Sequence, residues 1–161
     1  MKKSIYRMNS QYYANVIESF KESYNKFNMD NEKKLIENAI IQTLRKKSEY
    51  DAPRYISVKA NEMIKTYFNN RNITLDTHSK VHKINNNALP IILDHCIPVQ
   101  ELVIKYLNKE IGINDLLENC FTAAILKSEN QELNSNGFKN KRPPRWEDAY
   151  EKCKIGIVEY K

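Results

Sequence analysis

Apolar residues recur every three or four positions through most of the first 68 residues, and this spacing constrains the fold more than any other feature. In an α-helix the spacing places apolar side chains on one face. One pattern follows a capping residue, Ser10, and a second follows Asp30. A third begins near Ser57, or near Asp51 if Pro53 lies in its first turn. We therefore predict three amphipathic helices, of which the first two form a helical hairpin.

The second half of the chain combines short strands with further helices. Residues 89–93 and 120–126 are short apolar runs, "LPIIL" and "CFTAAIL", which are typical of buried strands. Weaker strand patterns occur at 80–84 and 155–160, and helical patterns at 99–107, 112–119, 128–137 and 146–153. We expect an α+β fold that is mostly helical. Its helical region, residues 1–75, would pack on a C-terminal core, residues 76–161.

The charge and the cysteines bear on partners and on the compartment. Lys and Arg outnumber Asp and Glu by 26 to 20, which gives a net charge of +6 and favours a polyanionic partner such as DNA. The three cysteines, Cys96, Cys120 and Cys153, lack the paired spacing of a disulfide framework or a zinc site. We therefore expect a cytoplasmic protein. No apolar run is long enough to form a signal peptide or to cross a bilayer, so we expect no membrane partner.

The stretch "ILDHCIP", residues 92–98, carries the most chemistry in the sequence. Asp94 and His95 directly follow a buried strand pattern, and Pro98 comes three residues later. An imidazole takes up protons near neutral pH and can act as a general base. A carboxylate is a suitable ligand for Mg²⁺. The alternative is structural: the aspartate caps a turn at the end of the strand, and the histidine is satisfied by hydrogen bonds.

This order of elements resembles the ββα-metal core of the HNH endonucleases. In that family a strand ends in an acidic residue and a histidine, an asparagine precedes the second strand, and the following helix supplies a metal ligand. Here the corresponding segments are "ILDHCIP", "ENCFTAAIL" and "KSENQEL". The last family histidine falls on Asn130, so the chain resembles an H-N-N variant. The similar stretch covers about residues 89–135 and has a long insertion between its strands.

The resemblance implies a metal-dependent endonuclease that hydrolyses the phosphodiester bonds of DNA. His95 would activate water, and Asn119 would orient the histidine or brace the metal loop. Asp94 and Asn130, or Glu129 in place of Asn130, would hold one Mg²⁺ or Mn²⁺ ion. Neighbouring residues of an extended strand point to opposite sides, so Asp94 and His95 can share one site only if the backbone turns there.

Basic residues near the C-terminus are candidates for phosphate binding. The loop "KNKRPPRW" interleaves its basic residues with prolines and Trp146, and one further lysine precedes Ser128. The candidates are Lys127, Lys139, Lys141, Arg142 and Arg145. The alternative is a solvated loop with Trp146 in the core. A homodimer would suit the cutting of both strands at a palindrome. A non-catalytic helical module that binds nucleic acid or another protein is the second functional reading.

Overall fold

The fold is taken from a computed structural model, which describes residues 3–68, 75 and 89–160. The chain is mostly helical with a small mixed sheet, and this confirms the predicted α+β class. It divides into two units, Met1–Lys47 with Val99–Cys120, and Ser48–Pro98 with Phe121–Lys161. Residues 99–120, which lie between two strands of the sheet, group with the N-terminal helices, and a domain boundary at residue 75 stays a prediction.

The first unit is helical. Helices α1 (Lys3–Lys26) and α2 (Asp30–Tyr50) form the predicted hairpin, although the last turn of α2 belongs to the second unit. Two shorter helices complete it, α5 (Val99–Leu107) and α6 (Ile113–Asn119). The ammonium group of Lys21 donates a hydrogen bond of 3.0 Å to the carbonyl of Tyr106 and lies 3.7 Å from the centre of its ring. This contact ties α1 to α5.

The second unit is built around a four-stranded sheet with the order β2-β3-β1-β4. The strands are β1 (Tyr55–Ser57), β2 (Ile91–His95), β3 (Thr122–Leu126) and β4 (Ile157–Glu159). β1 and β3 are parallel, and the other two pairs are antiparallel. β2, β3 and β4 lie where the sequence predicts strands, and β1 was not predicted. Three residues are too few to show a period of two.

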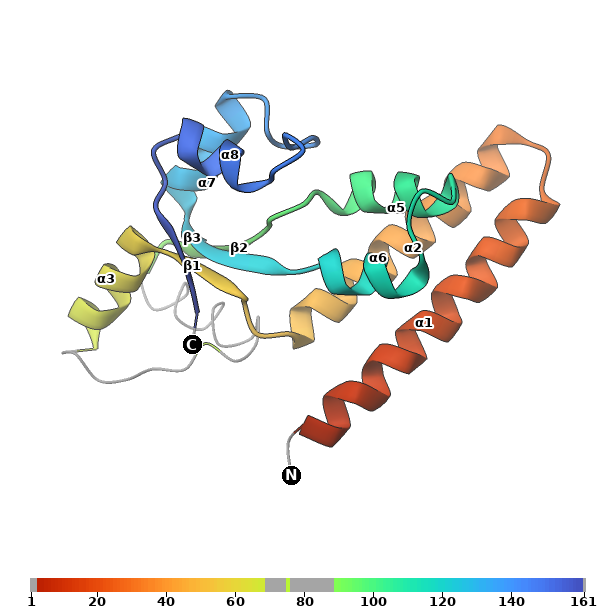
Figure 1. Ribbon diagram of the computed structural model, residues 1–161, viewed down its shortest axis with the longest axis horizontal. Coiled ribbons are helices and arrows are strands. Elements are labelled where there is room, and N and C mark those ends of the chain that lie inside the picture. The colour runs from red at the N-terminus through yellow and green to blue at the C-terminus, as the bar shows by residue number, and fades with distance from the viewer. Residues whose placement is uncertain (1–2, 69–74, 76–88, 161) are drawn as a thin grey trace. The chain divides into compact units, whose positions relative to one another are not determined.

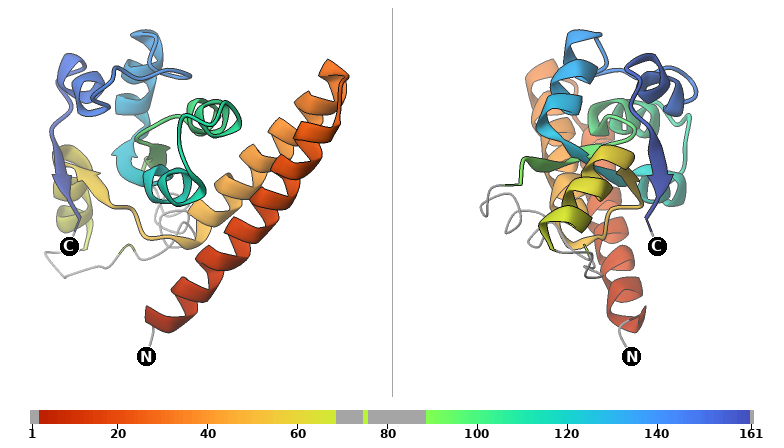
Figure 2. Two further views of the ribbon diagram at one scale, coloured as in Figure 1. Left: turned by 45° about the vertical axis from the view of Figure 1, so that its right-hand side comes forward. Right: turned by 90° about the vertical axis from the view of Figure 1, so that its left-hand side faces the viewer.

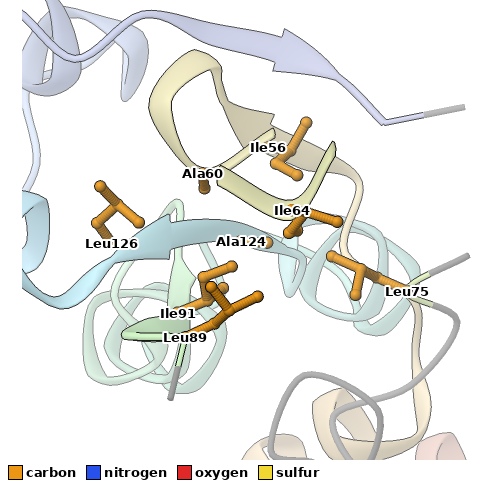
Figure 3. Packing of buried hydrophobic residues seen from close by; sticks show 8 residues of the cluster. All are labelled: Ile56, Ala60, Ile64, Leu75, Leu89, Ile91, Ala124 and Leu126. Carbon is orange, nitrogen blue, oxygen red and sulfur yellow. The ribbon is translucent and has the colours of Figure 1, made fainter. Parts of the chain in front are cut away.

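Helices cover both faces of this sheet. Helix α3 (Val58–Tyr67) lies on one face, and α7 (Lys127–Ser135) and α8 (Glu147–Lys152) lie on the other (Figures 1 and 2). The side chains buried with α3 are Ile56, Ala60, Ile64, Leu75, Leu89, Ile91, Ala124 and Leu126 (Figure 3). Those buried with α7 and α8 include Ala123, Ile125, Leu133, Ala149 and Tyr150. Alternate strand residues therefore serve separate cores.

Two sequence expectations concern other parts of the chain. The strand predicted at 80–84 lies outside the described residues. Among the helices that the structure describes, none has the length and apolar character needed to cross a membrane.

Candidate active site

Asp94 and His95 point to opposite faces of the sheet. Strand β2 continues through His95, where it pairs with Thr122 of β3, so the backbone does not turn between the two residues. Ile92 packs into the core under α7 and α8, whereas Leu93 packs against the core under α3. By alternation, Asp94 belongs to the first face and His95 to the second.

Asp94 is held by two donors from the C-terminal segment. Its Oδ2 accepts a hydrogen bond of 2.7 Å from a terminal nitrogen of Arg142, and another of 2.5 Å from the hydroxyl of Tyr150. The Arg142 side chain is only 3% exposed. It also donates to the carbonyls of Cys96 at 3.3 Å and Phe138 at 2.6 Å. Arg142 therefore joins the end of β2 to the loop after α7.

Burial is the largest cause of the pKa shifts in this cluster. It raises the pKa of the Asp94 carboxyl, while the charge of Arg142 and the two hydrogen bonds oppose the rise. Burial also raises the pKa of the Cys96 thiol and of the Tyr150 hydroxyl, and the negative charge of Asp94 adds to both shifts. The thiol of Cys96 is fully buried and stays protonated, which leaves it unsuited to act as a nucleophile.

His95 lies on the other face, at the same end of the sheet. Its Nε2 is 3.0 Å from the hydroxyl oxygen of Ser48, which fixes the orientation of the ring. The neighbouring Thr122 is buried, and its hydroxyl has no hydrogen-bond partner among the described residues. Arg54 donates its backbone N–H to the Thr122 carbonyl at 2.9 Å, and its guanidinium lies 4.4 Å from the centre of the Phe121 ring. Because Phe121 packs against the core under α7 and α8, the Arg54 guanidinium lies on the opposite face of the sheet from the His95 ring.

Glu129 lies near the other end of the strands. Its Oε2 accepts hydrogen bonds from the Ser57 hydroxyl at 2.6 Å and from the backbone N–H of Leu126 at 2.9 Å. Leu126 pairs with Ile91, three residues before Asp94, which corresponds to roughly 10 Å along the strand. Glu129 is buried and joins β1, the start of α3 and the turn into α7. The structure therefore does not bring it to Asp94.

The two asparagines of the predicted site belong to different units. Asn119 is the last residue of α6 in the first unit, and its side-chain amide donates to the Asp115 carbonyl at 2.8 Å. This is the contact expected of a residue that ends a helix. Asn130 is half-buried in the first turn of α7 in the second unit.

The described residues do not fit a magnesium site of the predicted kind. Asp94 already accepts from a guanidinium and a hydroxyl on one oxygen, and Glu129 lies about three strand residues away. The part of the chain that the structure describes contains no group of three His, Cys, Asp or Glu side chains placed to hold a metal ion. His78 and His82, which are four residues apart in the sequence, lie outside the described residues.

The basic loop after α7 is divided between a buried and an exposed part. Arg142, a predicted phosphate ligand, is instead an internal residue bound to Asp94. Lys139 and Lys141 on either side of the loop's Asn140 are exposed, as is Lys127 at the start of α7. The side chain of Arg145 is 69% exposed, although it lies within 4 Å of two carboxylates, those of Asp148 and Glu151.

Tyr150 and Ser48 are contributors that the sequence did not reveal. Tyr150 belongs to the apolar face of the last helix, where an aromatic residue predicts packing and gives no sign that its hydroxyl reaches Asp94. Ser48 lies 47 positions before His95 in the sequence.

Comparison with known proteins finds no matching family model, no matching curated protein and no matching solved structure.

Proposed function

We propose that the second unit binds nucleic acid and hydrolyses its phosphodiester bonds, with His95 as the general base. The observation that carries this proposal is an imidazole of fixed orientation at one end of the sheet, where cationic side chains lie on the opposite face. His95 ends β2, Arg54 flanks the next strand, and Arg142 anchors the basic loop to the carbonyl of Cys96, the residue after His95. The order of strand, strand and helix that resembles the HNH core also supports it.

The chemistry requires a proton acceptor and a stabiliser for negative charge. His95 would take a proton from the attacking water, because an imidazole is basic near neutral pH. Arg54 and the exposed lysines of the loop, on the opposite face, would bind neighbouring phosphates of the nucleic acid. Asp94 would not touch the substrate. It would serve as an internal counter-ion that keeps Arg142, and with it the loop, in place.

A cleavage assay with the full chain tests the proposal. Supercoiled plasmid and end-labelled single-stranded DNA and RNA are incubated with the protein in Mg²⁺, in Mn²⁺ and in EDTA. We expect nicked plasmid or shortened oligonucleotides. Cleavage that stops in EDTA would support the predicted requirement for Mg²⁺, although the expected ligands do not converge. Cleavage that continues in EDTA would support direct catalysis by protein groups. Intact substrates in every condition and at every pH would refute the nuclease proposal.

The second candidate is nucleic-acid binding without cleavage, which the anchored loop favours. The three hydrogen-bond acceptors of Arg142 hold the loop from within, so that Lys139 and Lys141 are presented to solvent whether or not His95 is catalytic. Pure binding predicts salt-sensitive retention of DNA that needs no metal and survives loss of the imidazole.

The loop lysines give a prediction common to both candidates. The double change Lys139→Ala/Lys141→Ala removes two phosphate contacts, so the slope of log affinity against log salt becomes shallower by about 1.8. Fluorescence anisotropy with a labelled duplex at several salt concentrations measures this slope. The matched control is Lys59→Ala/Lys65→Ala, which removes two exposed lysines from α3. A wild-type slope in the Lys139→Ala/Lys141→Ala variant would show that the loop does not contact phosphate.

A further inference from the structure

A partly enclosed pocket of about 340 Å³ lies against the sheet face that carries α8. Its volume is within the range of about 300–1,000 Å³ that is usual for small-molecule sites. The lining includes Tyr55 from β1, Trp146 before α8, Tyr150 from within α8 and Ile157 from β4. Because Tyr150 also donates to Asp94, the pocket adjoins the cluster that anchors the basic loop.

The walls of the pocket are suited to a flat ring. The centroids of Tyr55 and Trp146 are 5.0 Å apart with planes inclined at 56°, and those of Trp146 and Tyr150 are 5.6 Å apart with planes at 88°. Trp146 is only half-buried although it contacts several rings. A nucleobase stacks readily on such surfaces. The aromatic lining therefore selects a planar ligand.

The charged groups that line the pocket are both carboxylates. Glu147 and Glu151 are four residues apart, so they lie on the same side of α8. An ionised carboxylate can only accept hydrogen bonds. The ligand must therefore present N–H donors next to one another. Guanine does so with its ring N1–H and its exocyclic amino group, whereas uracil and thymine flank their one ring N–H with carbonyl oxygens that a carboxylate repels.

A cation near the carboxylates is placed to bind the phosphate of a nucleotide whose base occupies the pocket. A guanidinium nitrogen of Arg145 lies 3.8 Å from the Glu151 carboxylate, and both side chains are 69% exposed. An exposed pair of this kind is held weakly. A phosphate can therefore replace Glu151 as the partner of Arg145 when the base enters the pocket. Of the two carboxylates, the half-buried Glu147 is the better candidate to bind the base.

We propose that this pocket is a nucleobase subsite with a preference for guanine. The inference rests on the proposed function for its substrate class, since it makes the nucleic acid a guanine-containing one with an unstacked base. Trp146 stacks on the base and Tyr55 contacts its edge, Glu147 accepts from its Watson–Crick edge, and Arg145 binds the adjoining phosphate.

Fluorescence tests the proposal directly, because Trp146 is the chain's single tryptophan. Guanosine monophosphate, the three other ribonucleoside monophosphates and the corresponding nucleosides are titrated into the full chain. We expect saturable quenching by the guanine compounds, at least tenfold tighter than by the uracil compounds. Free N-acetyltryptophanamide corrects for absorption by the bases. Glu147→Gln keeps the size of the side chain and removes its charge, so it is expected to weaken guanine binding about tenfold. Glu62→Gln, which changes an exposed carboxylate of α3 outside this pocket, is the control and should leave binding within twofold.

Three results would overturn the subsite. They are quenching that does not saturate, equal affinity for all four bases, and a tighter response to tetramethylammonium, which would mark a pocket for cationic side chains. The nuclease proposal fails separately. If the wild-type chain binds guanosine and cleaves nothing, the subsite is supported and the nuclease proposal is refuted. If it cleaves nucleic acid but does not respond to guanine, the nuclease proposal is supported and the subsite is refuted.

Discussion

Replacing Arg142 by methionine is expected to lower the free energy of unfolding by about 3–5 kcal/mol, because it leaves the Asp94 carboxylate buried without its cation. Methionine keeps most of the side-chain length and removes all the donors. The hydrogen bonds to the carbonyls of Cys96 and Phe138 are lost as well. Urea unfolding of the full chain, followed by far-ultraviolet circular dichroism, measures the change.

The matched control for Arg142 is Arg145→Met. The side chain of Arg145 is 69% exposed and its two ion pairs are 3.5 Å and 3.8 Å long, so its loss should change stability by less than about 0.5 kcal/mol. A double variant Asp94→Asn/Arg142→Met should be more stable than the sum of the single changes implies. A loss below about 1 kcal/mol for Arg142→Met would show that the ion pair does not hold the second unit together.

The cost of losing Arg142 should also depend on pH. Burial raises the pKa of Asp94, and Arg142 opposes that rise, so the substitution raises the pKa further. A raised folded-state pKa favours the folded state below the unfolded-state value, near pH 4, and that benefit is lost as pH rises through the folded-state value. The stability difference between Arg142→Met and the wild type should therefore grow from acid to neutral pH. Unfolding curves at about pH 4, 6 and 8 measure it, and a constant difference would contradict the role given to Asp94.

The second large effect is catalytic. Changing His95 to glutamine should reduce the rate of phosphodiester cleavage by about 10²–10⁴-fold, the usual contribution of a general base. Glutamine can keep a hydrogen bond to Ser48 but cannot take up the proton. Single-turnover cleavage with saturating protein isolates this step from binding. DNA affinity measured by anisotropy should stay within about twofold.

Two variants keep the result for His95 interpretable. Ser48→Ala removes only the contact that orients the ring, so its rate should fall far less than that of His95→Gln. Asp94→Asn tests the predicted metal ligand, and as a positioning residue it should lower stability before it lowers the rate of the folded protein. A His95→Gln variant that cleaves at more than about a third of the wild-type rate would remove His95 from the reaction.

The sequence predicted most of the fold because periodicity and capping are local signals. Periodicity placed the helical hairpin, the two strands around "LPIILDH" and "CFTAAIL", and the helix that follows them. The predicted cap Ser10 was wrong, because α1 begins at Lys3 and Ser10 lies inside it. β1 escaped prediction because its three residues, Tyr55–Ser57, gain their pairing from β3 and β4, which are distant in sequence.

The site could not be predicted as well, because it depends on which face each side chain reaches. Asp94 and His95 are neighbours in sequence, yet the straight course of β2 sends them to separate cores. Arg142 looks like one of several loop cations, and only the fold shows that it is the internal one. The acidic residue expected to hold a metal, Glu129, instead joins Ser57 and Leu126. Composition carries no information about such partners.

The pairing of β1 has a consequence for biosynthesis. Tyr55 pairs with Ala123 on one side and with Glu159 on the other, so the sheet cannot close before residue 159 has left the ribosome. Contacts so distant along the chain form slowly, and they leave an unpaired strand exposed in the meantime. The two helices of the N-terminal hairpin are neighbours in sequence, so they can pack together before the strands that pair with β1 have been synthesised.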